Sequence, residues 1–365
     1  MSRRYDVAIV GAGMAGASLA AELAGEARVL ILEAESQPGY HSTGRSAAFW
    51  SETYGGPLIQ PLTSASGRFL AAPPIDFADR PLLTPRGALH VAAPGGEAAL
   101  AALAAEFTGS DIILQPIDRA GLADLLPGLR PGWTRALAEP SCADIDVAGL
   151  HAAYLKRARA RGAVLVADAA LQGASRRGAG WTIESAAGRF EADMLVNAAG
   201  AWADDVARRA GVAPLGIQPY RRTIVQARVE PPPPADLPLV IDVQGRFYFK
   251  PEVGGRLWLS PHDETACDPC DSAPEEIDVA LAIEGLERIV DWRVAQVERR
   301  WAGLRSFAPD RLPVYGFAEP GFFWCAGQGG FGIQTAPAAA KLAAALLLDR
   351  VPELDPHPYT PGRFA

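Results

Sequence analysis

The pattern of apolar positions is most regular at the start of the chain. The continuous apolar run at residues 7–10 has the length of a buried strand, and it breaks into the glycine-rich turn at residues 11–16. A stretch rich in alanine and leucine follows, and a second buried strand at residues 29–32 ends on Glu33. The pattern therefore predicts a strand, turn, helix and strand in that order.

The turn at residues 11–16 has the spacing Gly-x-Gly-x-x-Gly. In a dinucleotide-binding unit, Gly11 would permit the tight turn, Gly13 would let backbone N–H groups approach a pyrophosphate, and Gly16 would let helix and strand pack closely. Glu33, 22 residues after Gly11, is placed to accept from an adenosine ribose hydroxyl. The turn alone is a weak signal, but its context predicts a dinucleotide site and disfavours NADP, whose 2′-phosphate Glu33 would repel.

Two later segments repeat the same arrangement. A strand at residues 194–197 opens into small residues around Gly200, and a strand at residues 321–326 runs into the glycine-rich residues 327–332 before the last helix. No Lys-Ser/Thr pair follows those glycines, which argues against a P-loop. We expect the small residues near Gly200 to let the backbone approach the same nucleotide from the other side, and backbone N–H groups at the start of the last helix to face an anionic ring system.

The chain between these segments has a different character. Residues 214–296 contain short β-like runs separated by prolines and glycines, which predict an antiparallel sheet inserted into the nucleotide-binding domain. We predict an α/β fold with a discontinuous Rossmann-like domain and an α+β substrate-binding domain. The first comprises residues 1–80, 140–215 and 305–365, and the second residues 81–139 and 216–304.

Composition narrows the class of protein. The 365 residues include 42 acidic and 34 basic ones, a net charge of −8, which argues against a nucleic-acid partner. No run of 18 apolar residues and no secretory signal is found, so we expect a cytoplasmic protein without an integral membrane segment. The four cysteines do not make a disulfide framework, Cys267 and Cys270 form an isolated CxxC, and the dispersed histidines give no metal site.

The loop at residues 36–56 is too rich in glycine, serine and threonine for a regular element. Because a loop leaving the second strand passes close to the bound dinucleotide, we expect residues 42–46 to contact it and residues 47–54 to form a mobile cover. In the strand near residue 88, alternation puts Ala88 and His90 on one face.

Eight motifs run in one order from residue 5 to about residue 340: GAGMAGAS, GYHSTGRSAAFW, ADIDVAGLHAAYL, LVNAAGAWADD, QPYRRT, FYFKP, WAGLRSF and FFWCAGQGGFGIQT. On these motifs the chain resembles the FAD-dependent D-amino acid oxidase and dehydrogenase family, and within it most closely the bacterial D-arginine dehydrogenases. The resemblance implies non-covalent FAD, with the flavin ring between residues 42–47 and 327–334. The cofactor residues expected on these grounds are Gly11, Gly13, Met14, Ala15, Gly16, Glu33, Ser42, Thr43, Gly44, Arg45, Ser46, Ala47, Val166, Ala199, Gly200, Trp202, Gly327, Gly329, Gly330, Phe331, Gly332, Ile333 and Gln334.

The resemblance also implies the catalytic side chains. Arg222 and Arg305 would hold the substrate carboxylate, since arginine binds that group bidentately, and Tyr54 and Tyr248 would add hydroxyls. The alternatives are a solvated strand arginine for Arg222 and core packing for the tyrosines. Arg305 lies in an apolar run, where an unpaired charge is costly to bury, so a partner is expected. No side chain is an evident base for the substrate amine, which leaves water or a shifted substrate pKa.

The chain departs from the arginine-specific relatives at two positions. Ala88 stands where they carry a glutamate for the distal guanidinium, and Phe49 where their lid loop carries a histidine. We therefore expect oxidative deamination of a neutral or apolar D-amino acid to a 2-oxo acid and ammonia. Phe49, Ala88, His90, Gly330 and Gln334 would contact the substrate, and the acceptor would be O₂ or a quinone.

Three other functions remain open from the sequence. The first is a secondary-amine oxidase of glycine or sarcosine type, the second is a flavin-dependent 2-hydroxy acid dehydrogenase, and the third is a non-catalytic FAD-binding subunit.

Overall fold

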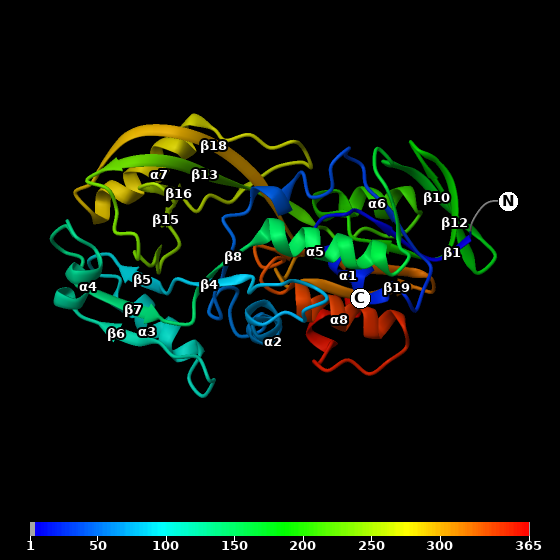
Figure 1. Ribbon diagram of the computed structural model, residues 1–365, viewed down its shortest axis with the longest axis horizontal. Helices are drawn as coiled ribbons and strands as arrows, with labels where there is room; N and C mark the ends of the chain where they lie inside the picture. The colour runs from blue at the N-terminus through cyan, green and yellow to red at the C-terminus, as the bar shows by residue number, and fades with distance from the viewer. Residues whose placement is uncertain (1–3, 365) are drawn as a thin grey trace.

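The N-terminal segment folds as its apolar pattern predicts. The structure is a computed structural model that describes residues 4–364. Strand β1 (Arg4–Val10), helix α1 (Met14–Leu23) and strand β2 (Val29–Leu32) form a strand–helix–strand unit in which the two strands are parallel. This unit lies at the centre of one of two parts that sit side by side along the long axis of the molecule (Figure 1).

The first part is built on an eight-stranded sheet with the order β10-β11-β12-β1-β2-β9, and β20 and β19 continue it beside β12. The strands β12, β1, β2 and β9 are parallel, whereas β10, β11 and β19 run antiparallel to their neighbours. The remaining strands of this sheet are β9 (Val164–Val166), β10 (Leu171–Arg177), β11 (Gly180–Ser185), β12 (Gly188–Asn197), β19 (Val314–Glu319) and β20 (Phe322–Ala326).

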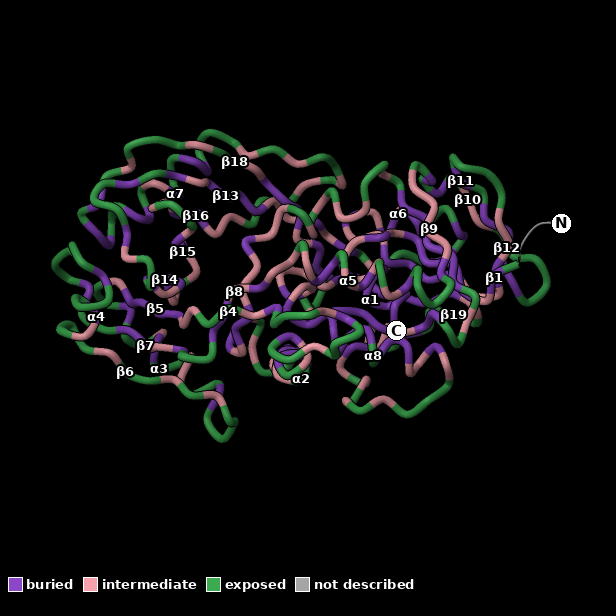
Figure 2. Tube along the Cα trace, viewed as in Figure 1, coloured by how far each residue is buried: buried purple, intermediate pink, exposed green. Residues whose placement is uncertain are grey.

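Both faces of this sheet are covered, which explains why its strands read as continuous apolar runs. Val7 and Ile9 point into a core shared with α1, α5 (Val147–Ala160) and α8 (Ala336–Leu347). Ala8 and Val10 point into a second core that includes α6 (Ala203–Arg209). Figure 2 shows these central strands buried and the outlying loops exposed.

The second part is built on a ten-stranded sheet with the order β21-β18-β13-β16-β15-β14-β5-β7-β6, and β17 pairs with β13. It is antiparallel except for the pair β14 and β5. Its strands are β5 (Ala88–Ala92), β6 (Gln115–Ile117), β7 (Arg135–Glu139), β13 (Gln218–Glu230), β14 (Leu239–Asp242), β15 (Tyr248–Glu252), β16 (Arg256–Ser260), β17 (Thr265–Ala266), β18 (Arg293–Phe307) and β21 (Gln328–Gly329).

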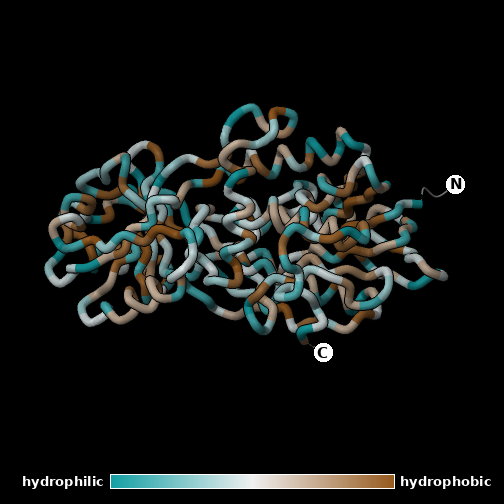
Figure 3. Tube along the Cα trace, turned by 90° about the horizontal axis from the view of Figure 1, so that it is seen from below, coloured by the Kyte–Doolittle hydropathy of each residue, from teal (hydrophilic) through white to brown (hydrophobic). Residues whose placement is uncertain are grey.

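A third, three-stranded sheet lies between the two parts, and further helices cover the outside. Hydrophobic segments gather inside each part when the molecule is seen from below (Figure 3). The small sheet comprises β3 (Phe49–Trp50), β8 (Ala143–Ile145) and β4 (Leu83–Pro85). The other helices are α2 (Gln60–Ala71), α3 (Glu97–Glu106), α4 (Arg119–Leu125) and α7 (Glu276–Ile289).

The α/β fold with mixed sheets is confirmed, and two details differ from the prediction. Residues 300–310 do not return to the nucleotide-binding part at residue 300, because β18 stays in the ten-stranded sheet to Phe307. Strand β19 was not predicted; its first half is buried, whereas its second half, residues 317–319, is exposed. The domain boundaries themselves stay a prediction. Within residues 4–364, no helix is long and apolar enough to cross a membrane.

Candidate active site

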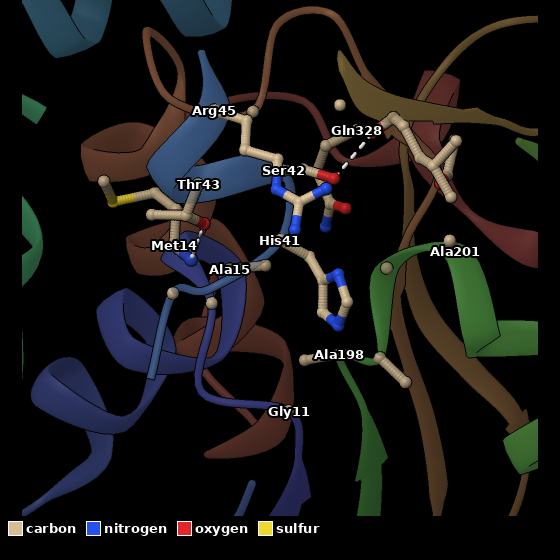
Figure 4. Close-up of a pocket in the computed structure, with 18 of the residues that line it drawn as sticks. Gly11, Met14, Ala15, His41, Ser42, Thr43, Arg45, Ala198, Ala201 and Gln328 are labelled. Atoms are coloured by element: carbon tan, nitrogen blue, oxygen red, sulfur yellow. Dashed lines mark hydrogen bonds between the residues drawn. The ribbon is translucent and has the colours of Figure 1, made fainter. Parts of the chain in front are cut away.

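A cavity of about 500 Å³ runs between the two parts of the molecule. One section of its wall comes from the β1–α1 turn, the end of β2 and the loops after β2 and β12. The other section comes from β13, β15 and β18 together with the segment around Tyr54. Figure 4 shows residues of the first section converging on this space.

The glycine turn is shaped by close backbone contacts. Gly11 has φ +103°, and a Cβ there would lie 2.5 Å from the Ala198 carbonyl oxygen. A Cβ on Gly16 would lie 1.9 Å from the carbonyl oxygen of Gly11. The two glycines therefore have the roles that the sequence predicts, a tight turn and a close packing of helix on strand.

Glu33 completes this section of the wall. It is 8% exposed, and its two carboxylate oxygens accept from the backbone N–H groups of Ala12 (2.7 Å) and Glu35 (3.0 Å). Thr43 accepts from the Met14 N–H at the start of α1 (2.9 Å), as Figure 4 shows. The glycine turn, the N-terminus of α1 and the fixed Glu33 carboxylate together fit the adenosine and phosphates of a dinucleotide.

His41 also points into this section (Figure 4), and no role was predicted for it. Its Nε2 lies 2.9 Å from Glu35 Oε1, and its ring lies 4.5 Å from the Trp202 ring. His41 lies in the loop at residues 36–56, directly before the residues 42–46 for which cofactor contact was expected, and Glu35 directly precedes this loop. The fixed orientation of His41 depends on Trp202, which is remote in sequence.

Arg222 is the most buried charge of the other section. It is 4% exposed, its Nε donates to the Asp263 carbonyl oxygen (2.8 Å), and one terminal nitrogen lies 3.3 Å from Glu264 Oε1. Its other terminal nitrogen, Nη1, has no partner among the described residues. Burial, and then the neighbouring Arg305 guanidinium, lower the pKa of Arg222 to about 10, so the group stays charged at neutral pH.

Arg305 lines the cavity beside Arg222. In residues 4–364 it has no ion-pair partner within 4.0 Å, and its guanidinium carbon lies 5.7 Å from the centre of the Tyr54 ring. The carboxylates of the cavity wall, Glu33, Glu35 and Asp205, all belong to the nucleotide-binding section. The section around Arg305 therefore carries a positive charge that an anionic ligand would compensate.

Three aromatic rings narrow the space beside the arginines. The Phe49 ring lies 5.4 Å from Tyr54 and 6.0 Å from Tyr248. The Tyr54 hydroxyl packs on Gly330, where a Cβ would lie 2.3 Å from it. Burial raises the pKa of Tyr248, which therefore keeps its proton.

Most of the predicted site residues line this one cavity. They are Gly11, Gly13, Met14, Ala15, Glu33, Ser42, Thr43, Arg45, Ser46, Ala47, Phe49, Tyr54, Ala199, Gly200, Trp202, Arg222, Tyr248, Arg305, Gly329, Gly330, Gly332, Ile333 and Gln334. Seven predicted residues do not line it: Gly16, Gly44, Ala88, His90, Val166, Gly327 and Phe331.

His90 is placed differently from the prediction. Its Nε2 lies 3.0 Å from Glu139 Oε2 in a buried pair, so the proposed polar contact with substrate is not seen. Ala88 is buried in the cluster behind Tyr248, one layer from the cavity. Gly16 and Gly44 close backbone turns, Val166 accepts from the Glu33 N–H, Gly327 packs on Ala308, and Phe331 supports Tyr54.

The expected mobile cover at residues 47–54 is also not what the structure contains. Phe49 and Trp50 pair with β8, and the Trp50 indole donates to the Thr63 carbonyl oxygen (3.0 Å). Ser51 and Thr53 are buried and hydrogen-bonded. The glycines and small polar residues that suggested a loose loop instead permit tight packing.

Several wall residues were not among the predicted site residues. Leu171, Arg209 and Ile224 come from elements with no local motif, whereas Asp205, Gly303 and Gln328 lie within quoted motifs that do not themselves indicate which of their members face the cavity.

Comparisons with known proteins agree with this geometry. The model of the family DAO, FAD dependent oxidoreductase, matches residues 6–346. A glycine oxidase of Pseudomonas aeruginosa is 31% identical over 189 residues, so the match covers 49% of this chain and only about half, 48%, of that protein. The hydrogen cyanide synthase subunit HcnC of the same species is 25% identical over 100% of this chain and 97% of its own.

Among solved structures, glycine oxidase from Geobacillus kaustophilus superposes with a TM-score of 0.86 at 24% identity, covering 98% of both chains. At this identity the likeness shows the fold alone. These relatives do not include D-arginine dehydrogenase, so the narrower resemblance drawn from the motifs is not supported by them.

Proposed function

Since the chain belongs to the family of FAD dependent oxidoreductases that the DAO model describes, we propose that it oxidises the C–N bond of a small, neutral α-amino acid. The class of reaction, an FAD-dependent oxidation of an amine or amino acid, follows from the family. The size and charge of the substrate are the proposal.

FAD is the cofactor, and the residues present fit it. The turn at Gly11, the start of α1 and Glu33 would hold its adenosine and phosphates, and the segment from Gly329 to Gln334 would face the flavin. FAD, when bound, supplies a two-electron acceptor for the substrate Cα–H. The cysteines of the described chain do not line the cavity.

One observation carries the proposal for the substrate. Arg222 offers a buried, unpartnered Nη1 and Arg305 lacks a carboxylate partner in the described residues, and both line the same section of the cavity. A substrate carboxylate would satisfy both groups and be held in a fixed orientation, so that its Cα faces the cofactor. The hydroxyls of Tyr54 and Tyr248 would add to this clamp.

The section of the cavity wall around Arg222 and Arg305 disfavours a substrate with a cationic side chain. Among residues 4–364, no carboxylate lines this section of the wall, and Ala88 gives no counter-charge for a guanidinium or ammonium group. A buried cation without a counter-charge costs several kcal/mol. The rings of Phe49, Tyr54 and Tyr248 further limit the length of the side chain, which favours glycine, N-methylglycine and small D-amino acids.

The amine proton has no obvious protein acceptor. His262 is near Arg222 and Arg305, but burial and then these two charges lower its pKa to about 2. Its Nδ1 lies 2.9 Å from the Gly245 carbonyl oxygen, so this nitrogen carries the proton. We therefore assign the amine proton to water. The imine that forms is hydrolysed to a 2-oxo acid and ammonia. An N-alkyl substrate gives a 2-oxo acid and the corresponding alkylamine.

Anaerobic titration of the yellow protein tests the proposal. Glycine, N-methylglycine and D-alanine should bleach the flavin well before D-arginine or D-lysine does, and L-enantiomers should be inactive. Faster bleaching by D-arginine would contradict the proposal that the site disfavours cationic side chains because it lacks a counter-charge. Bleaching by lactate or 2-hydroxyglutarate alone would instead identify a 2-hydroxy acid dehydrogenase, which would use the same two arginines.

A second candidate comes from the full-length similarity to a protein named as a subunit. If this chain is a non-catalytic FAD-binding subunit, the purified protein will bind FAD and no small acid will reduce it. If a small acid does reduce the flavin, a further measurement identifies the electron acceptor. Reoxidation of the reduced flavin is followed in air and with a quinone, which distinguishes O₂ from a quinone as the acceptor.

A further inference from the structure

Glu139 lies outside the cavity and is the centre of a fully satisfied buried network. It ends β7 and has 0% exposure. Its Oε1 accepts from the Glu52 N–H (2.7 Å), and its Oε2 accepts from Ser51 Oγ (3.0 Å) and Thr53 Oγ1 (2.7 Å) and lies 3.0 Å from His90 Nε2. One carboxylate of the ten-stranded sheet thus binds three consecutive residues of the N-terminal part of the chain.

Gln334 holds the backbone at the two ends of this segment, at Ser51 and at Tyr54. Its side-chain oxygen accepts from the Ser51 N–H (3.2 Å), and its nitrogen donates to the Tyr54 carbonyl oxygen (3.2 Å) and to Thr63 Oγ1 (2.9 Å). Residues 51–53 are therefore fixed between the substrate-binding sheet and the start of α8. Few conformations of this segment can satisfy both sets of bonds.

The segment carries an active-site side chain at each of its ends. Phe49 precedes it and Tyr54 follows it, and both line the cavity beside Arg305. We propose that Glu139 is a positioning residue, which sets Tyr54 and Phe49 against the arginine pair by binding residues 51–53. This proposal depends on one part of the proposed function, namely that Arg222 and Arg305 bind a carboxylate.

The hydrogen-bond partners of Glu139 allow the effect of its shape to be tested separately from the effect of its charge. The Glu52 N–H at Oε1 can only donate. The partners of Oε2 are two hydroxyls, which can rotate, and a histidine, which can change tautomer, so each can accept as well as donate. A glutamine whose oxygen replaces Oε1 can donate its two N–H groups to two of the three partners of Oε2. The contact between the Ser51 and Thr53 hydroxyls (3.2 Å) can satisfy the third, so the network is kept without the charge.

Burial acts to raise the pKa of Glu139, but the hydrogen bonds from His90, Thr53 and Ser51 outweigh it and leave this pKa below its usual value. The carboxylate is therefore ionised at neutral pH and its bonds are charge-assisted. Truncation to alanine would leave the partners buried without an acceptor, and residues 51–53 would rearrange.

The test is a double-mutant cycle between E139A and Y54F, with E139Q as the isosteric control. The readout is the Kd of acetate, measured from the change it causes in the absorbance of the bound flavin. Acetate is a carboxylate that the enzyme cannot deaminate, so this readout is independent of the substrate. The FAD content of each variant is measured as well.

E139A should weaken acetate binding by about tenfold or more, the loss expected for a hydrogen bond to a charged group, with FAD content kept. E139Q should stay within about threefold of the native protein, because its neutral hydrogen bonds differ by only a fraction of that energy. The double variant should bind acetate within about twofold of the weaker single variant, since coupled sites are not additive.

Independent, multiplying losses in E139A and Y54F would overturn the proposal, as would native acetate binding in E139A. D242A removes another fully buried carboxylate of the same sheet, one that binds Arg246, and should reduce stability without changing the acetate Kd. Where E139A fails to fold, S51A and T53V each remove one side-chain bond to Glu139 and enter the same cycle. If the protein oxidises no amino acid but shows this coupling between Glu139 and Tyr54 in acetate binding, the proposed function is disproved and the positioning role of Glu139 stands.

Discussion

Arg222 and Arg305 are diagonal neighbours on two adjacent strands. In the antiparallel pair of β13 and β18, Arg222 lies opposite Gly303 and Tyr220 lies opposite Arg305. Opposed residues share a face and so do residues two apart on one strand, so both guanidinium groups project from the same face into the cavity. A Cβ at Gly303 would lie 3.2 Å from the Arg45 Cβ, so the missing side chain lets Arg45 pack against this strand.

Replacing either arginine should therefore remove carboxylate binding without removing FAD. We expect R305M and R222M to lower kcat/KM by about 10- to 100-fold, the range for a lost hydrogen bond to a charged group. Steady-state kinetics with the best substrate of the panel would measure this. R221M is the control, because Arg221 projects from the other face to Glu275 and Asp278. An equal loss in R221M would mean that the strand, rather than the clamp, was damaged.

Glu33 should decide how tightly FAD is held. In E33A the N–H groups of Ala12 and Glu35 lose their acceptor, and the ribose loses its partner. The Kd of FAD should rise by at least about tenfold, as judged by titrating apoprotein and following flavin fluorescence. E184A, a change at an exposed position of β11, should leave FAD binding unchanged. Tight FAD binding by E33A would show that Glu33 is only a structural cap.

Gly16 should tolerate no side chain. A Cβ would lie 1.9 Å from the Gly11 carbonyl oxygen, so G16A must push α1 away from the turn. We expect a protein with little or no bound FAD and a lower midpoint of thermal unfolding. The matched change G173A, on β10, meets no atom within 4 Å and has no left-handed backbone, so it should be neutral. A yellow, stable G16A variant would contradict the close packing described here.

His262 should make the folded protein sensitive to acid. Burial, followed by Arg222 and Arg305, lowers its pKa to about 2, whereas in the unfolded chain it has its usual value of 6.5. Below pH 6.5 the unfolded state binds a proton that the folded state excludes, so the free energy of unfolding falls as the pH falls.

The variant H262N tests this effect. Asparagine suits the left-handed backbone at this position (φ +55°) and does not titrate, so the variant should lose less stability between pH 6.5 and pH 4 than the native protein does. Urea unfolding at several pH values would measure the difference. Parallel curves for the two proteins would show that other groups control the acid response.

The nucleotide-binding half could be predicted because its signals are local. Gly11, Gly16 and Glu33 lie within a single strand–helix–strand unit, where spacing alone indicates their roles. The arginine pair needed the family resemblance, because nothing in the sequence near Arg222 or Arg305 indicates that their strands are neighbours. The burial argument for Arg305 predicts a partner for its charge; the described residues offer no carboxylate within 4.0 Å, and a substrate carboxylate in that role stays a prediction.

The errors share one physical cause, which is that the partners are distant in sequence. His90 was expected to contact the substrate, yet it pairs with Glu139, 49 residues away. Residues 51–53 seemed free because their acceptor is the same Glu139, more than 80 residues further along the chain. A pattern of polar residues cannot distinguish a solvated loop from one whose hydrogen bonds are all internal.

The long pair of β13 and β18 contains two bulges, and their location has an evolutionary consequence. Both lie in the half distant from the cavity, next to Ala227 and Val229, while the pairing from Arg299 to Phe307 is uninterrupted. A strand alternates its faces at every residue, so one inserted or deleted residue between Arg299 and Arg305 would turn Arg305 away from the cavity. Length variation among descendants of this enzyme should accumulate at the distant end, where an extra residue can bulge out harmlessly.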